Sequence, residues 1–341
     1  MRDIRDLSFD ELRAVLAEDG EPAYRAEQVF AWLYRRGASS FAEFTDLPRP
    51  LRDRLAARFS LRPLEAVEIR CSADGTTKTL FRLSDGWNIE TVFIPSGTRR
   101  TICLSTQAGC KFSCAFCASG KGGFHRHLTP GEILGQVLHF RSGPDAGLTN
   151  LVFMGMGEPL DNLDNVERVL RVLNDPRGFG FAARRMTVST CGLVPGIERF
   201  ARIDLQINLS ISLHAADDET RNRLMPVNRR YPLAELISAC EDYLAAGGRK
   251  ITFEYVLLKG VNDRPADAER LARLARRLGA KVNLIAFSPV EGLPFERPDP
   301  EAASAFAGRL RNKGTAVTVR SSKGSDIQAA CGQLAGSPAA G

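Results

Sequence analysis

Three cysteines lie close together in the order Cys-x3-Cys-x2-Cys, at Cys110, Cys114 and Cys117. Thiolates are the usual protein ligands of iron–sulfur clusters, and a [4Fe–4S] cluster takes four of them. Three thiolates on one short loop would leave one iron without a protein ligand. The spacing therefore predicts a cluster with one iron open to an exchangeable molecule.

Two interpretations of this loop are open. A zinc site would combine three close cysteines with a distant fourth in a closed tetrahedron, although zinc ligands are usually spaced in pairs. The spacing also resembles the signature of radical S-adenosylmethionine enzymes, in which the amino and carboxylate groups of S-adenosylmethionine (SAM) chelate the fourth iron. Phe112 and Phe116 lie inside the loop and glycines flank it, so it can close over a cluster. We favour the second interpretation.

Composition predicts a cytoplasmic enzyme. The 341 residues are 44% apolar, enough to bury a substantial core. No apolar run approaches the roughly 18 residues that cross a bilayer, so we expect no membrane contact. The charged N-terminus lacks the apolar centre of a signal peptide. Eight cysteines in such a chain indicate reduced, working thiols, and we expect a monomer.

Basic residues gather in two parts of the chain. The segment from Thr91 to Gly131 contains no carboxylate, and its basic residues are Arg99, Arg100, Lys111, Lys121 and Arg126. Such a stretch attracts polyanions, or offsets an anionic cluster. The other part is the N-terminal segment, residues 1–62, which contains Arg35, Arg36, Arg49, Arg52, Arg54, Arg58 and Arg62. These arginines would suit phosphate backbones or form a solvated helix face, and both alternatives stay open.

The pattern predicts an α/β fold with accessory pieces. Residues 1–62 predict a small helical accessory domain, with RNA binding as one of the two alternatives above, residues 63–98 a β-hairpin extension, residues 99–335 the core with the cysteine loop, which is a radical SAM core on the interpretation favoured above, and residues 336–341 a flexible tail. In the core, strands and helices alternate. The expected strands are Thr101–Ser105, Asn150–Met154, Met186–Thr190, Leu205–Leu213, Ile251–Leu258 and Val282–Phe287, with a last strand at Ala316–Arg320. Six β/α repeats are fewer than the eight of a closed barrel, which predicts a partial (β/α)6 TIM-type barrel.

Residues whose side chains could bind a ligand or react lie at the ends of these strands. The cysteine loop follows the first strand and Gly155–Pro159 the second, whereas Ser189 ends the third strand and Ser212–His214 ends the fourth. Functional residues of barrels lie at the C-terminal ends of their strands. We therefore expect these groups to share one face.

Together the motifs resemble the RlmN/Cfr family of radical SAM RNA methyltransferases, from about residue 7 to 335. The matching motifs are Phe116–Phe124, Met154–Leu160, Ser210–Ala215, Leu224–Asn228 and Ala330–Leu334. The resemblance implies a [4Fe–4S] cluster on Cys110, Cys114 and Cys117, and two SAM molecules per turnover. It implies SAM contacts at Gly157, Glu158, Ser189, Ser212, Leu213 and His214. Ser288 stands where the family has a further contact, an asparagine.

The resemblance also implies a mechanism for methylating C2 of adenine, which is too electron-poor to attack SAM directly. Cys331 matches the cysteine that first takes a methyl group from SAM. A radical made from a second SAM then activates that methyl group, which adds to C2. Glu90 matches the proton acceptor, and Cys103 matches the thiol that releases the product through a transient disulfide. The implied targets are adenine 2503 of 23S rRNA and adenine 37 of some tRNAs, with an electron donor such as flavodoxin.

Three alternatives remain at this point. A Cfr-like enzyme would methylate C8 of the same rRNA adenine, and Pro159 favours the C2 branch. A zinc-knot RNA-binding protein would have no catalysis. A radical SAM enzyme for a peptide or small molecule fits the basic segments less well. Cys71, Cys191 and Cys240 match no family role, and Cys240 is expected in the core because apolar residues accompany it on a helix.

Overall fold

A computed structural model describes residues 1–141 and 147–336. Within them, one sheet of ten strands has the order β14-β13-β12-β11-β10-β9-β6-β5-β4-β3. Every pair from β6 to β14 is parallel, and every pair from β3 to β6 is antiparallel. The parallel strands are β6 (Arg99–Cys103), β9 (Asn150–Phe153), β10 (Met186–Thr190), β11 (Asn208–Ser212), β12 (Thr252–Leu257), β13 (Lys281–Ala286) and β14 (Val317–Arg320).

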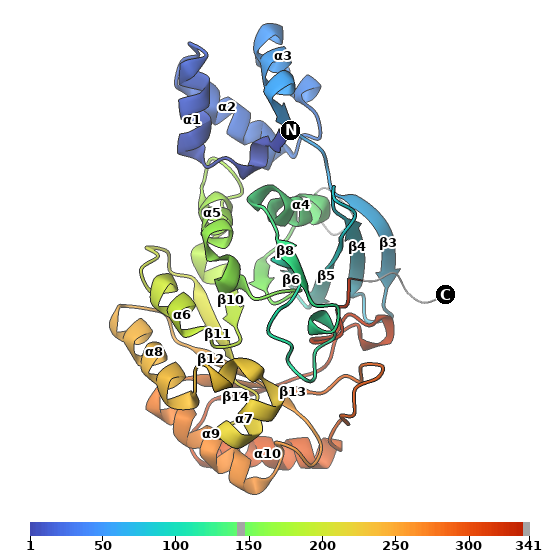
Figure 1. The fold of residues 1–341 in the computed structure, drawn as a ribbon, viewed down its shortest axis with the longest axis vertical. Helices are drawn as coiled ribbons and strands as arrows, with labels where there is room; N and C mark the ends of the chain where they lie inside the picture. The colour runs from blue at the N-terminus through green and yellow to red at the C-terminus, as the bar shows by residue number, and fades with distance from the viewer. Residues whose placement is uncertain (142–146, 337–341) are drawn as a thin grey trace.

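The parallel part is an incomplete barrel, as the sequence predicts. Strand β14 pairs with β13 alone among the described strands, so the barrel does not close onto β6. Helices connect the strands on the outside (Figure 1). They are α4 (Pro130–Arg141), α5 (Leu163–Asn174), α6 (Val194–Phe200), α7 (Asp218–Leu224), α8 (Leu233–Ala245), α9 (Pro265–Arg277) and α10 (Pro300–Asn312).

Local signals explain where some of these helices begin. Helix α4 begins at Pro130, and Thr129 before it forms the expected capping pair with Glu132. The Glu132 amide donates to Oγ1 of Thr129 at 3.3 Å, and the Thr129 amide donates to Oε2 of Glu132 at 3.0 Å. Such reciprocal bonds satisfy amides that the first helical turn leaves free. Helix α9 begins at Pro265, where proline costs no helical hydrogen bond.

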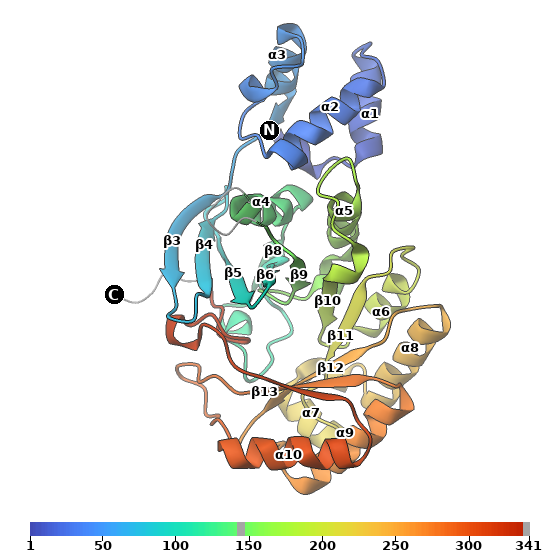
Figure 2. The ribbon, with the colours of Figure 1, turned by 180° about the vertical axis from the view of Figure 1, so that it is seen from behind.

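The expected hairpin is present and gains a third strand. Strands β4 (Thr77–Arg82) and β5 (Asn88–Ser96) form the hairpin, and β3 (Glu65–Cys71) pairs with β4 on the other side. Because β5 also pairs with β6, this meander continues the barrel sheet. The C-terminal segment returns to lie at the end of β3 and β4 (Figure 2).

The N-terminal helices stand at one end of the barrel, near α5 (Figure 1). They are α1 (Phe9–Glu18), α2 (Tyr24–Ala31) and α3 (Arg49–Arg58), joined by a short parallel pair, β1 (Arg2–Asp3) with β2 (Phe59–Ser60). Arg168 of α5 pairs with Glu11 of α1 at 2.6 Å. No helix in the described ranges is long and apolar enough to cross a membrane.

Candidate active site

A two-stranded ribbon closes the base of the cysteine loop. Strand β7 (Gln107–Gly109) pairs with β8 (Phe124–His127), and the Cys110 amide donates to the Gly123 carbonyl at 2.9 Å. Gly109 has a φ of 74°, and a Cβ atom there would lie 1.9 Å from the Gly123 oxygen. Glycine is therefore required where the two sides of the loop approach each other.

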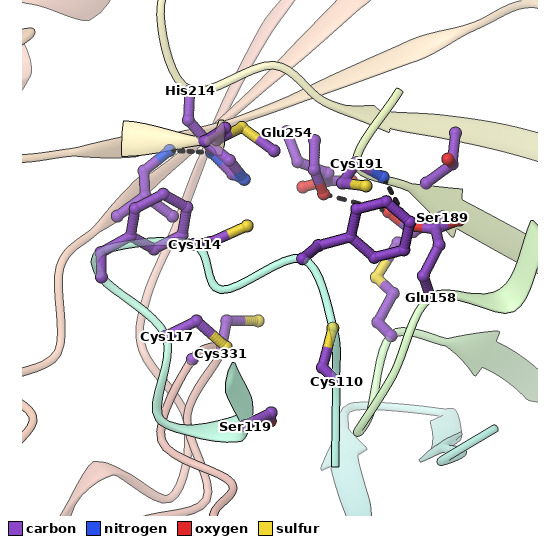
Figure 3. Close-up of a pocket in the computed structure, with 18 of the residues that line it drawn as sticks. Cys110, Cys114, Cys117, Ser119, Glu158, Ser189, Cys191, His214, Glu254 and Cys331 are labelled. Atoms are coloured by element: carbon purple, nitrogen blue, oxygen red, sulfur yellow. Dashed lines mark hydrogen bonds between the residues drawn. The ribbon is translucent and has the colours of Figure 1, made fainter. Parts of the chain in front are cut away.

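The three loop cysteines line one cavity (Figure 3). Burial raises the pKa of each thiol, that of Cys110 to about 12. Within the described ranges, no group of three or more His, Cys, Asp or Glu side chains is placed to hold a single metal ion. The thiols surround a space instead of meeting at one point. This donor set fits a cluster whose irons take one thiolate each.

Glu158 carries a buried carboxylate at the same cavity. The Cys191 amide donates to its Oε2 at 2.7 Å and the Leu160 amide to its Oε1 at 3.0 Å. Burial raises the pKa of Glu158, although these amides and the Thr190 hydroxyl act against that rise. Gly157 before it has a φ of 97°, and a Cβ atom there would lie 2.5 Å from the Gln107 side chain. The turn after β9 therefore needs glycine to place the carboxylate.

Ser189, Ser212 and His214 bring two further strand ends to the cavity. The hydroxyls of Ser189 and Ser212 lie 3.3 Å apart. His214 has a left-handed backbone with a φ of 55°, and its Nδ1 accepts a hydrogen bond from the Val256 amide at 3.0 Å. Burial, with Arg221 nearby, lowers the pKa of His214 to about 3. The imidazole is therefore a neutral group at the cavity wall.

Two predicted contacts lie outside this lining. Leu213 is fully buried, and its amide donates to the Glu254 carbonyl at 3.0 Å. Ser288 follows β13 and is also buried, with its hydroxyl accepting a hydrogen bond from Arg297 at 3.4 Å. The side chains of both residues are absent from the described lining of the cavity.

Sequence reasoning missed Glu254 on β12. Its side chain is buried and lines the cavity. Asn283 donates to Oε1 at 3.0 Å, but Oε2 has no hydrogen-bond partner among the described residues. Nη1 of Arg320 lies 3.7 Å from Oε2. A charged residue inside an otherwise apolar buried strand was the signal that could have found it.

Arg221 on α7 was also missed. It is fully buried, and burial lowers its pKa. Its guanidinium donates to the carbonyls of Cys191 at 2.7 Å and Leu213 at 3.1 Å. The side chain thus ties together the chain after β10 and the chain after β11. Arg221 is therefore a positioning residue. It holds Cys191, whose amide binds Glu158, and it holds Leu213, which precedes His214.

Cys331 connects this cavity with a second one. The second cavity has a volume of about 340 Å³, and Cys331 and Arg320 line both. Cys103 at the end of β6 lines the second cavity. Burial and the neighbouring Cys331 thiol raise the pKa of Cys103 to about 12. Two thiols far apart in sequence therefore lie at one cavity.

The fold around Cys331 keeps it beside the cysteine loop. The Ala118 amide donates to the Gly332 carbonyl at 2.7 Å, and the Ser119 hydroxyl donates to the Leu334 carbonyl at 2.6 Å. Cys331 is an exposed residue and lines both cavities. The surrounding protein displaces part of the water around its thiol and so raises its pKa, while Arg320 acts in the opposite direction.

Comparison with known proteins agrees with this geometry. Residues 104–291 match the family described as "Radical SAM superfamily". Residues 2–61 match the "Ribosomal RNA large subunit methyltransferase N-terminal domain". The "Dual-specificity RNA methyltransferase RlmN" of Geobacter sulfurreducens is 51% identical, over 98% of this chain and 92% of that protein. The probable enzyme of the same name from Heliobacterium modesticaldum is 47% identical, over 98% and 89%. The chain belongs to the RlmN family of radical SAM RNA methyltransferases.

A solved structure supports the same assignment. The "radical SAM methyltransferase from Sphaerobacter thermophilus" superposes with a TM-score of 0.94 at 48% identity, covering 99% of this chain and all of that one. As a member of the RlmN family, the chain is a transferase with a [4Fe–4S] cluster and SAM as cofactors. This assignment confirms the second interpretation of the loop, the radical SAM signature that we favoured, and replaces the zinc-knot alternative.

Ion pairs balance part of the basic charge that stood out in the sequence. Lys111 pairs with Asp161 at 2.5 Å, and Arg126 pairs with Glu132 at 2.7 Å and with Asp85. In the N-terminal helices, carboxylates pair with Arg36, Arg49, Arg54 and Arg58. Arg99 lines the second cavity, together with Arg320 and Lys323. Arg320 and Lys323 are also near carboxylates, with Arg320 3.7 Å from Glu254 and Lys323 3.7 Å from Asp74.

Proposed function

We propose that this member of the RlmN family methylates C2 of adenine, at position 2503 of 23S rRNA and position 37 of some tRNAs. Cys331 carries the methyl group between cofactor and substrate. The observation that supports this most is the place of Cys331, which lines both the cavity of the three loop cysteines and the cavity of Cys103. A carrier thiol must reach both the methyl donor and the acceptor.

The first cavity has the groups that SAM requires. Cys110, Cys114 and Cys117 hold the cluster, which supplies the radical chemistry when SAM is bound. The Glu158 carboxylate accepts hydrogen bonds from the SAM ammonium group, because it is buried and its described partners are neutral amides and a hydroxyl. Ser189 and Ser212 present hydroxyls that can donate to the SAM carboxylate.

The second cavity suits a single base carried on a phosphate backbone. Its volume of about 340 Å³ is at the lower end of small-molecule sites. The wall combines apolar side chains with Ser, Thr, Arg and Lys residues. An adenine inside folded RNA must leave its stack to enter such a cavity, and cations at the entrance favour the flanking phosphates.

Two further residues complete the transfer. After the methyl group carried by Cys331 has lost one hydrogen atom to the radical, its carbon bonds to C2, and the C2 hydrogen leaves as a proton to Glu90. The adduct also gives up its unpaired electron, which the oxidised cluster would accept. The Cys103 thiolate then attacks the sulfur of Cys331 and forms a Cys103–Cys331 disulfide, while the methylene carbon keeps the electrons of the broken sulfur–carbon bond and takes up a proton to become the C2 methyl group. An external thiol reductant restores both cysteines, and a separate protein such as flavodoxin supplies electrons to the cluster.

An anaerobic assay tests this function. Purified holoenzyme receives SAM with a labelled methyl group, a reductant and protein-free 23S rRNA or tRNA, and nucleosides from the digested RNA are compared with C2- and C8-methyladenosine standards by mass spectrometry. The proposal expects label only in 2-methyladenosine. Label in 8-methyladenosine would assign the Cfr-like activity instead. Absence of label from both RNAs, with cluster and SAM bound, would overturn the proposal.

A further inference from the structure

The segment that carries Cys331 is held by the β3–β5 meander. At its entry, the Ser72 hydroxyl donates to Asp326 at 2.7 Å and the Gly324 amide donates to Asp74 at 3.2 Å. Ser72 and Asp74 lie in the turn between β3 and β4. The segment then runs along the end of these strands (Figure 2). The meander therefore supports the methyl-carrying loop as well as extending the sheet.

One buried ion pair ties together the two ends of this loop. Nζ of Lys78 on β4 lies 2.7 Å from Oε1 of Glu90 on β5, and their side chains are 7% and 2% exposed. Lys78 also donates to the Gln328 carbonyl at 3.1 Å. Oε2 of Glu90 accepts hydrogen bonds from the amides of Ala335 at 2.7 Å and Gly336 at 3.0 Å. The ion pair thus joins residue 328 to residues 335 and 336, with Cys331 between them.

These bonds occupy Glu90 on both sides. Lys78 binds one oxygen, and two loop amides bind the other. A proton acceptor must come within hydrogen-bond reach of the proton that it takes. Glu90 lines neither of the two cavities, so in this arrangement it holds the loop and does not face a substrate.

We propose that the Lys78–Glu90 pair is a clasp that holds the Cys331 loop in the position for methyl loading, and that opening of its Ala335–Gly336 side frees Glu90. Lys78 is then a positioning residue, acting through Glu90 and Gln328. This inference rests on the proposed function for the role of Glu90 as proton acceptor. The clasp makes that role available only after the loop has moved.

The contacts of the Lys78–Glu90 pair favour reversible opening of the Cys331 loop over a fixed structural role. Removing one partner of a buried ion pair leaves an uncompensated charge, which strongly destabilises the arrangement that buries it. Among the described residues, the two side chains have three hydrogen-bond partners outside the pair itself, the Gln328 carbonyl and the Ala335 and Gly336 amides, and all three belong to the loop. Loss of the Lys78 charge should therefore open the loop before it unfolds the sheet.

Hydrogen–deuterium exchange of the reconstituted holoenzyme, without RNA, tests the clasp. We expect Lys78→Met to speed exchange of the amides of Ala335 and Gly336 by about tenfold or more, because a buried unpaired carboxylate favours local opening. Lys78→Arg restores a cation and should keep exchange near the unsubstituted rate. Arg82→Met is the matched control, because Arg82 lies on the same strand and pairs with Glu65, away from the loop.

A second readout separates positioning from general damage. Methyl loading of Cys331 is followed by the mass of its peptide, and methyl transfer is followed in protein already loaded. The clasp predicts that Lys78→Met slows loading more than transfer and that Lys78→Arg recovers loading. Equal loss in both steps, or exchange unchanged in folded Lys78→Met, would overturn it, as would equal acceleration in Arg82→Met.

If Lys78→Met does not fold, Glu90→Gln tests the same prediction, because glutamine has nearly the same side-chain shape as glutamate. It should also speed exchange at residues 335 and 336, and unchanged exchange would again overturn the clasp. The exchange experiment needs no RNA and no turnover. A failure of the proposed function, seen as absent 2-methyladenosine, therefore stays distinct from a failure of the clasp, seen as unchanged exchange.

Discussion

The backbone amide of Cys191 donates a hydrogen bond of 2.7 Å to Oε2 of Glu158. This bond joins the chain after β10 to the turn after β9, and it fixes one carboxylate oxygen at the cavity of the three loop cysteines. Arg221 holds the carbonyl of the same Cys191 at 2.7 Å. The carboxylate is therefore preorganised by a backbone amide whose residue is held in turn by the Arg221 side chain.

Glu158→Ala should weaken SAM binding without loss of the cluster. A hydrogen bond to a charged group contributes roughly 1.5–3 kcal/mol, which corresponds to about 10- to 100-fold in Kd. Isothermal titration calorimetry of the reconstituted protein measures this change. Asp161→Asn is a control on the same turn, because Asp161 pairs with Lys111 and does not line the cavity. SAM affinity equal to that of the unsubstituted protein would remove Glu158 from the site.

Glu254→Gln should also weaken SAM binding, by a smaller factor. Oε2 of Glu254 is buried, has no hydrogen-bond partner in the part of the chain that the structure describes, and belongs to a side chain at the cavity wall. A bound cofactor with hydroxyl or amine donors can satisfy that oxygen, whereas the glutamine variant has one acceptor oxygen fewer. The same calorimetric titration measures the effect. An increase in affinity would show that the charge is a cost to SAM binding.

Cys114→Ala should abolish bound iron and the broad visible absorption of the cluster. Cys114 lines the cavity with the other two loop cysteines, and two thiolates are too few for a cluster that already has one open iron. Iron analysis and visible spectra of anaerobically reconstituted protein test this. Cys240→Ala is the matched control, since Cys240 is a buried core cysteine on α8. A full complement of iron in Cys114→Ala would contradict the loop assignment.

The barrel could be read from the sequence because parallel strands are short apolar runs bounded by turn signals. The predicted Met186–Thr190 agrees with β10 at both ends, and Ala316–Arg320 differs from β14 by one residue. Strand β3 was missed because it lies at the sheet edge and is mostly exposed. The ribbon of β7 and β8 was missed because its strands are short and β8 consists of Phe124, Arg126 and two histidines.

The sequence motifs predicted which residues gather at one cavity, but not the contacts between distant segments that hold them there. Residues that follow parallel strands gather on one face, and this placed the cysteine loop, Glu158, Ser189 and His214 together. The Lys78–Glu90 pair and the Arg221 bonds could not be predicted, because each depends on packing between distant segments. Ser288 stays a prediction as a SAM contact, and its described partner is Arg297.

If Cys103 releases the product as proposed, product release should depend on pH. Burial and the adjacent Cys331 thiol raise its pKa to about 12, so only a small fraction is thiolate near neutral pH. Below the pKa that fraction rises about tenfold per pH unit. The covalent enzyme–RNA species should therefore decay faster as pH rises from 7 to 9. Rapid-quench denaturing gels measure this decay, and a rate independent of pH would show that thiolate formation does not limit release.

Removal of Cys331 and removal of Cys103, the two thiols at the second cavity, should block the reaction at different steps. Cys331→Ala should eliminate all methyl transfer, because no carrier accepts the first methyl group. Cys103→Ala still loads Cys331 and adds to adenine, but it lacks the thiol that breaks the sulfur–carbon bond. Protein crosslinked to RNA should therefore accumulate, visible on denaturing gels as a slow, nuclease-sensitive band.

The double variant is the control for that band, since protein without Cys331 has no carrier to form the link. The Cys331 peptide from Cys103→Ala, digested after reaction, should carry the mass of a methylene bridge to a nucleotide. This outcome depends on the shared cavity, where Cys103 is the other thiol near Cys331 outside the cysteine loop. Full product from Cys103→Ala without any crosslink would exclude the two-cysteine mechanism, even if the cluster and SAM assignments remained correct.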